Sequence, residues 1–107
     1  VVVYAPHREP FGFVPLEAMA CGVPVVAVAE GGVMETVRHQ ETGLLVERDA
    51  AQFANAVQEL LVNDQMRDHF GKQGRNVVEE HWSWERSVIG LGEHLTLTSC
   101  LTERRMA

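Results

Sequence analysis

The sequence predicts an α/β protein, with a partial parallel sheet of about three strands, flanking helices and a helical C-terminal part. Two observations support this prediction. Short apolar runs alternate with helix-length segments along the first half of the chain. The second half carries apolar residues at helical spacing and has no further strand-like run. Strands that alternate with helices favour parallel pairing through right-handed crossovers.

The three predicted strands are short and apolar. The first is VVVY at residues 1–4, a run that suits a strand covered on both faces. The second is PVVAVA, from Pro24 to Ala29, and the third is LLV at residues 44–46. A loop rich in Pro and Gly, Ala5 to Phe13, follows the first strand.

Two helices are predicted between these strands. The first runs from about Pro15 to Cys21, because Pro favours the first helical position and Gly22 stands just past the end. A glycine-containing turn at residues 30–32 precedes a short helix from about Val33 to Arg38. Gly43, before the third strand, is expected to be a turn residue only.

Three more helices are predicted after the last strand, each with a capping side chain. Asp49 begins the first, where Gln52 completes the pattern of a capping box; Asn63 or Asp64 begins the second, and Ser83 the third. Helical spacing predicts these inward faces: Phe53, Val57, Leu60 and Leu61; Met66, Phe70 and Val77; and Trp84, Val88, Leu91 and Leu95.

Composition excludes some classes of partner. The chain has 107 residues, enough for one small domain, and a formal net charge of −6 from 9 Lys+Arg and 15 Asp+Glu. Nucleic acid is therefore not expected as a partner, because a phosphate backbone needs a basic face. A single phosphorylated ligand stays possible, since a few backbone donors can hold it. No segment has the length of a transmembrane span or the pattern of a signal peptide.

Cysteine and histidine usage indicates neither a disulfide framework nor a metal site. Cys21 and Cys100 are expected to be reduced thiols in a cytoplasmic protein, with Cys21 as a small core residue. The five histidines lack the spacing of zinc ligands. No metal and no cofactor is therefore expected.

The segment EPFGFVPLE, residues 9–17, contains the expected binding site. A strand precedes it and a helix begins within it, an order that α/β proteins use to hold phosphorylated ligands. A helix that starts at Pro15 would have Val14 at its cap position, so its first N–H groups would lack a side-chain acceptor. The expected donors to a diphosphate are the backbone N–H groups near Gly12, Phe13 and Val14, and that of Leu16.

Two carboxylates flank these donors, which suggests a ligand with hydroxyl groups as well as phosphate. They belong to Glu9 and Glu17. An alternative needs no ligand: water satisfies the helix end, and Glu17, near the third helical position, bends back as a capping partner. Glu9 would then be an ordinary loop acid.

The longer run EPFGFVPLEAMACGVPVVA resembles the signature of the group 1 family of retaining, sugar-nucleotide-dependent glycosyltransferases. The similarity continues through GGVMETV, ETGLLV and WSWE. The resemblance covers residues 1–95, which are expected to form the C-terminal part of a Rossmann-like donor-binding domain of the GT-B fold. Residues 96–107 lose the apolar pattern and are expected to fray.

The resemblance also implies roles for individual residues. Glu17 is similar to the family glutamate that accepts hydrogen bonds from the ribose hydroxyls. Glu9 is similar to the glutamate near the transferred sugar, where a catalytic role in stabilising positive charge at the anomeric carbon is implied. A nucleophilic Glu9 is disfavoured, since in this family the attack is thought to come from the leaving-group face. The implied turns beside the donor are Phe11, Gly12 and Phe13, whose amides would touch sugar and phosphates, and Gly31 with Gly32, near the sugar.

The function implied is transfer of a hexose from a nucleoside-diphosphate sugar, of the UDP or GDP type, to an acceptor. Because Val1 is not a start methionine and falls inside a predicted strand, we expect a fragment that lacks an N-terminal acceptor-binding domain and is inactive alone. The missing domain could attach the enzyme to a membrane surface, and an uncovered sheet edge could form a homodimer. The last helix is expected to brace the missing domain.

Two other interpretations stay open. The first is a non-catalytic nucleotide-binding or interaction module left by truncation. The second keeps the fold but changes the chemistry to that of an epimerase or a phosphorylase. His7 alone does not establish an epimerase, and no lysine is evidently placed for pyridoxal phosphate.

Overall fold

The computed structural model describes residues 1–8 and 10–106, with side chains through Cys100. Three parallel strands form one sheet in the order β1 (Val2–Tyr4), β2 (Val25–Val28) and β3 (Gly43–Val46). In the register, Val3 of β1 lies beside Val26 of β2, which lies beside Leu44 of β3. The predicted α/β class and the three parallel strands are confirmed.

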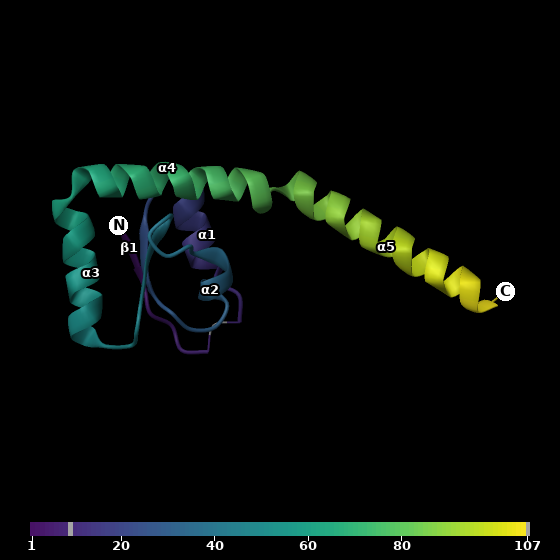
Figure 1. The fold of residues 1–107 in the computed structure, drawn as a ribbon, viewed down its shortest axis with the longest axis horizontal. Coiled ribbons are helices and arrows are strands. Elements are labelled where there is room, and N and C mark those ends of the chain that lie inside the picture. Colours follow the sequence, from purple (N-terminus) through teal and green to yellow (C-terminus); the bar gives the residue numbers. More distant parts are fainter. Residues whose placement is uncertain (9, 107) are drawn as a thin grey trace.

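The described residues also form five helices (Figure 1): α1 (Phe13–Ala20), α2 (Val33–Thr36), α3 (Ala50–Val62), α4 (Asp64–His81) and α5 (Trp84–Met106). α1 and α2 cover one face of the sheet and α3 covers the other. α4 crosses the end at which the strands begin, and α5 projects away from this body. α4 therefore does not cover the loops at the opposite end, where the strands finish.

Alternation of side chains along the strands divides the core into two clusters. On the α1 face, Val25 and Ala27 pack with Met19 of α1 and Val33 of α2. On the α3 face, Val26 packs with a second set of buried residues: Leu44, Ala56, Leu60 and Phe70. Together the two clusters hold the three strands rigidly, with the loops after them fixed at one edge.

The predicted caps of the long helices are confirmed. The Asp49 carboxylate accepts from the Gln52 N–H at 2.9 Å, and the Asn63 side chain accepts from the Met66 N–H at 3.0 Å. The Ser83 hydroxyl accepts from the Arg86 N–H at 3.2 Å. Each of these bonds satisfies a backbone donor that the first turn of a helix leaves without an internal partner.

The predicted start of α1 is wrong by two residues. α1 begins at Phe13, so Pro15 occupies the third helical position and Gly12 is the cap residue. Gly12 has a φ of +96°, a left-handed conformation that favours glycine. The rule that places Pro at the first helical position failed because the N–H of the third position also has no partner inside the helix. Pro, which lacks an N–H, is therefore tolerated at either position.

Three smaller predictions are also wrong. Gly43 is more than a turn residue: it begins β3, and a Cβ there would lie 2.2 Å from the Val25 carbonyl oxygen. Cys21 is exposed at the end of α1 and does not belong to the core. Leu61 is 57% exposed, while Leu60 of the same predicted face is fully buried.

The apolar stripe of α5 does not pack inward. Its four predicted residues are all at least half exposed: Trp84, Val88, Leu91 and Leu95. The helix continues to Met106 in the structure, and the fraying expected of residues 96–107 stays a prediction. Among the described residues, no helix combines the length and the apolar character needed to span a membrane.

Candidate functional site

The candidate site lies where β1 and β2 end, between the loop that leads into α1 and the turn that leads into α2. We call its five residues, Phe11, Gly12, Phe13, Gly31 and Gly32, the mouth. All five were predicted as site residues from sequence, as two separate turns. The structure brings these two turns together.

The contact between the two turns depends on glycine. A Cβ on Gly32 would lie 2.3 Å from the Cα of Phe11, so no other residue fits there without movement of backbone. A Cβ on Gly12 would lie 3.3 Å from the Val33 backbone and 3.2 Å from the Thr36 hydroxyl. Of the glycine pair, Gly31 has a positive φ, +60°, and Gly32 does not. The two glycines therefore serve different needs, one conformational and one steric.

Aromatic rings support the mouth from the side of α4. The ring of Phe11 lies 5.4 Å from that of Trp82 in an edge-on arrangement, and 4.7 Å from that of Phe13. Phe11 and Trp82 are partly buried against the core. Phe13 is 65% exposed, so its side chain does not fill the core. These contacts join the end of α4 to the loop that precedes α1.

The N-terminus of α1 has no side-chain cap among the described residues. Because the helix starts at Phe13, the N–H groups of its first turn belong to Phe13 and Val14, and Pro15 has none. Leu16 lies at the fourth helical position with its side chain in the core. In a regular helix, an N–H at that position bonds back to the cap carbonyl.

Glu17 does not cap this helix. It is the fifth residue of α1 and lies beyond the first turn. The first turn itself contains no acidic residue. Its side chain is exposed, and among the described residues its carboxylate takes part in no hydrogen bond or ion pair. The ligand-free alternative, in which Glu17 bends back to the helix end, is therefore not what the structure shows. Glu9, the other predicted carboxylate, lies outside the described residues.

An ion pair, missed by the sequence interpretation, ties the loops of this edge together. Arg48, in the loop between β3 and α3, donates to both carboxylate oxygens of Glu30, from Nε at 3.2 Å and from Nη2 at 2.8 Å. The same guanidinium donates to the backbone carbonyls of Ala5, at 3.5 Å, and Pro6. One side chain therefore contacts the loops that follow β1 and β2 while it belongs to the loop after β3.

The pair is ionised over a wide pH range. The hydrogen bond from Arg48 holds the pKa of Glu30 below its usual value, with further help from the positive charge of Arg48 and of His7. The same hydrogen bond raises the pKa of Arg48. One sequence signal could have indicated this ion pair: Glu30 and Arg48 have opposite charges, and each stands two residues after the end of one of two adjacent parallel strands. Sequence patterns for turns treat both as solvated loop residues.

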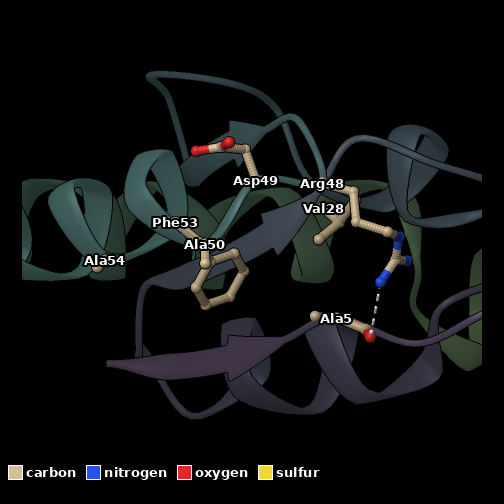
Figure 2. A pocket seen from close by; sticks show the side chains of 7 residues that line it. All are labelled: Ala5, Val28, Arg48, Asp49, Ala50, Phe53 and Ala54. Atoms are coloured by element: carbon tan, nitrogen blue, oxygen red, sulfur yellow. Dashed lines mark hydrogen bonds between the residues drawn. The ribbon is translucent and has the colours of Figure 1, made fainter.

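A pocket of about 390 Å³ lies beside Arg48 on the α3 face of the sheet (Figure 2). Val28 forms its floor, and Phe53 and Ala54 of α3 form one wall. The lining is mostly apolar, and Arg48 and Asp49 provide its polar groups. Because Phe11 and Val33 belong to the α1 face, the pocket and the mouth lie on opposite faces of the sheet. Within the described residues, no cluster of three potential metal ligands was found.

Three parallel strands with helices on both faces define a Rossmann-like α/β protein. The chain belongs to the family described as glycosyl transferases group 1, whose model matches residues 1–77. The resemblance expected from the sequence motifs is thereby confirmed. The structural neighbours are glycosyltransferases of the GT-B fold.

The chain is similar to relatives that are much longer. It is 38% identical over 95 residues to the human protein named alpha-1,3/1,6-mannosyltransferase ALG2, covering 89% of this chain and 23% of that protein. Sucrose-phosphate synthase from Thermosynechococcus elongatus matches with a TM-score of 0.83 and 40% identity, over 92% of this chain and 26% of that one. Anabaena HepE, in complex with UDP, matches with a TM-score of 0.75 and 30% identity, over 91% and 27% respectively. The chain thus spans about a quarter of the length of these proteins.

Proposed function

We propose that this chain is the donor-binding part of a retaining, sugar-nucleotide-dependent glycosyltransferase, and that its mouth binds the diphosphate of the donor. The protein would transfer a hexose from a nucleoside diphosphate to an acceptor. The observation that carries this proposal is the close contact between Gly32 and Phe11 beside the uncapped start of α1. Two turns predicted as separate parts of one site lie against each other.

The chemistry of this place suits a diphosphate. The N–H groups of Phe13 and Val14 belong to a first helical turn that has no side-chain cap from the part of the chain that the structure describes. A helix N-terminus carries a partial positive charge, so an anion gains both hydrogen bonds and a favourable dipole interaction there. Gly12 itself is buried against Val33 and Thr36, and the exposed residues of this helix start are Phe13 and Val14. The family membership makes a sugar nucleotide the expected anion.

The two glutamates are proposed to hold the hydroxyl groups of the donor. An ionised carboxylate is an acceptor only, and it can bind two hydroxyls at once. Glu17 is exposed and takes no capping role, which leaves it available for the ribose. Glu9 is proposed as the catalytic carboxylate near the transferred sugar, on the sequence resemblance alone, since it lies outside the described residues.

Two types of nucleotide, UDP and GDP, are candidates for the donor. Anabaena HepE was solved in complex with UDP, and a relative from Mycobacterium tuberculosis, 42% identical over 88 residues, is named a GDP-mannose-dependent mannosyltransferase. These names support the UDP and GDP types of donor equally. Both nucleotides are therefore included in the experiment below.

Partners beyond the donor follow from family membership and length. Since the related proteins are about four times longer, we propose that an acceptor-binding domain completes the enzyme and that this chain alone is inactive. We also propose a cytoplasmic location. β1 is an edge strand of the described sheet, with Val3 exposed, so a homodimer through this edge is a further possibility that sedimentation of the isolated chain would test.

The test is a titration of the 107-residue chain with UDP, GDP and ADP, followed through its backbone amide resonances. We expect shifts centred on Gly12 to Glu17 and on Gly31 and Gly32. The substitution Glu17→Ala should weaken binding about tenfold, as for loss of a charged hydrogen bond. The matched control is Glu59→Ala, an exposed glutamate on α3.

Two results would reject the proposal. One is a set of shifts on another part of the surface, for example around the apolar pocket next to α3. The other is an unchanged affinity in the Glu17 variant. For Glu9, activity in the completed enzyme is the measure: Glu9→Ala should lower kcat more than it raises the dissociation constant of the donor. Equal losses would argue against a role in the transition state.

A further inference from the structure

We infer that Arg48 is a positioning residue, whose bonds to Glu30 and to the Ala5 and Pro6 carbonyls keep the mouth in the shape that binds nucleotide. This inference rests on the proposed function of the mouth. Neither residue of the ion pair belongs to the motif by which the chain resembles its family. The Arg48 guanidinium makes five hydrogen bonds, three to Glu30 and one each to the carbonyls of Ala5 and Pro6.

The first step is the geometry of the ion pair. Nε and Nη2 of Arg48 both face the Glu30 carboxylate, at 3.2 Å and 2.8 Å, which is a two-point contact along one edge of the guanidinium. Such a contact fixes direction as well as distance. Nη2 also donates to the Pro6 carbonyl, and Nη1 points to that of Ala5. These hydrogen bonds fix the orientation of the Arg48 side chain, and they hold the three partner groups in place.

The second step connects these partners to the mouth. Glu30 is joined directly to Gly31 and Gly32, the turn that touches Phe11. Pro6 lies on the segment that leads from β1 to Phe11 and Gly12. Both turns of the mouth are therefore attached to Arg48 on their upstream sides, and they touch each other at Gly32. Loss of the guanidinium would remove this polar connection and leave the packing of Gly32 on Phe11 and of Gly12 on Val33.

The third step concerns stability. The side chains of Arg48 and Glu30 are 34% and 50% exposed, and ion pairs this exposed contribute little to the free energy of unfolding. A residue with five hydrogen bonds and a small expected effect on folding suits the control of loop geometry. Misplacement of binding groups by a fraction of an ångström is enough to reduce affinity strongly.

A direct contact between Arg48 and the diphosphate is the competing explanation, and the Glu30→Gln variant separates the two. If Arg48 bound phosphate itself, removal of the Glu30 charge would free the guanidinium and tighten nucleotide binding. If Arg48 positions the mouth, Glu30→Gln must weaken binding in the same direction as Arg48→Gln. The double variant should then be no weaker than the stronger single one, because both remove one connection.

The experiment measures UDP and GDP affinity and amide exchange for Arg48→Gln, Arg48→Lys, Glu30→Gln and their parent. We expect about tenfold weaker binding in all three variants, including Lys, because one ammonium group cannot reproduce the planar fork. Amide exchange should rise at Ala5 to Gly12 and at Glu30 to Gly32, while the melting temperature changes by a few degrees at most. The control is Arg38→Gln, an exposed arginine paired with Glu41 at 3.7 Å.

The outcomes are distinct. Unchanged affinity and unchanged exchange in the Arg48 variants would overturn the inference, as would tighter binding in Glu30→Gln. Rescue by Arg48→Lys would also overturn it, since it would show that charge alone suffices. If the parent chain binds neither nucleotide, the proposed function fails, whereas the exchange data still report whether Arg48 orders the two loops.

Discussion

Gly32 and Phe11 meet backbone to backbone: a Cβ on Gly32 would stand 2.3 Å from the Phe11 Cα and 2.4 Å from its carbonyl oxygen. Real Cβ atoms do not approach that closely, so a larger residue would force the two turns of the mouth apart. The contact makes the shape of the candidate site depend on a residue in another loop.

The substitution Gly32→Ala should therefore be costly although its φ of −66° is available to alanine. We expect the free energy of unfolding to fall by about 2 kcal/mol, the cost of overpacking, as measured by urea denaturation. Amide shifts should spread to Phe11 and Gly12. Gly90→Ala is the control, because nothing lies within 4 Å of the methyl group it would add. Equal stability of the two variants would contradict the described contact.

The Glu30 carboxyl should titrate below the ordinary glutamate range. Its folded pKa is lowered by Arg48, so the contribution of the pair to folding is fully present above the unfolded pKa of about 4.3 and is lost as the pH falls through the lower folded value. Carbon-detected titration of the side-chain carboxyl measures this midpoint. In Arg48→Gln the midpoint should rise, and high salt should reduce the difference. An unshifted Glu30 midpoint in the parent chain would show that the pair is not formed in solution.

Leu60 and Leu61 separate burial from helical spacing. Leu60 is fully buried in the cluster on the α3 face, whereas its neighbour is mostly exposed. Leu60→Ala should lower the free energy of unfolding by about 3 kcal/mol, because it leaves a cavity. Leu61→Ala should change it by less than about 0.5 kcal/mol. Chemical denaturation of both variants provides the measurement. Similar losses of stability would show that the inward face of α3 is not the one described.

Asn63 links α3 and α4 as the cap of the second of these helices. Its side-chain oxygen accepts from the Met66 N–H at 3.0 Å. Asn63→Ala should cost about 1 kcal/mol of stability, since that donor would lose its partner. Asn76→Ala, an exposed site inside α4, serves as the comparison and should be neutral or slightly stabilising, because alanine favours helix. A thermal melt of each variant distinguishes the two cases.

The strands and long helices could be predicted because local patterns suffice for them. VVVY, PVVAVA and LLV are apolar runs of strand length, and Asp49, Asn63 and Ser83 cap helices through neighbours three residues away. Such signals need no knowledge of tertiary structure. The family signature also singled out the two turns that the structure brings together at the mouth.

What could not be predicted depends on residues far apart in the chain. The need for glycine at Gly43 comes from the Val25 carbonyl, and at Gly32 it comes from Phe11. Arg48 and Glu30 are 18 residues apart and become neighbours through the pairing of β2 with β3. Phe13 is exposed at the first position of α1, whereas the cap rule placed the start of this helix two residues later. In each case tertiary contacts decide a role that local sequence leaves open.

α5 differs from the rest of the molecule in how its folded state is maintained. Trp84 is 81% exposed, and a Cβ added at Gly90 or Gly92 would meet nothing within 4 Å, so the helical form of α5 depends on local propensity rather than on burial. Two glycines lower that propensity by about 1 kcal/mol each relative to alanine. On warming, the isolated chain should therefore lose ellipticity gradually from this segment, before the sheet melts in a single cooperative step.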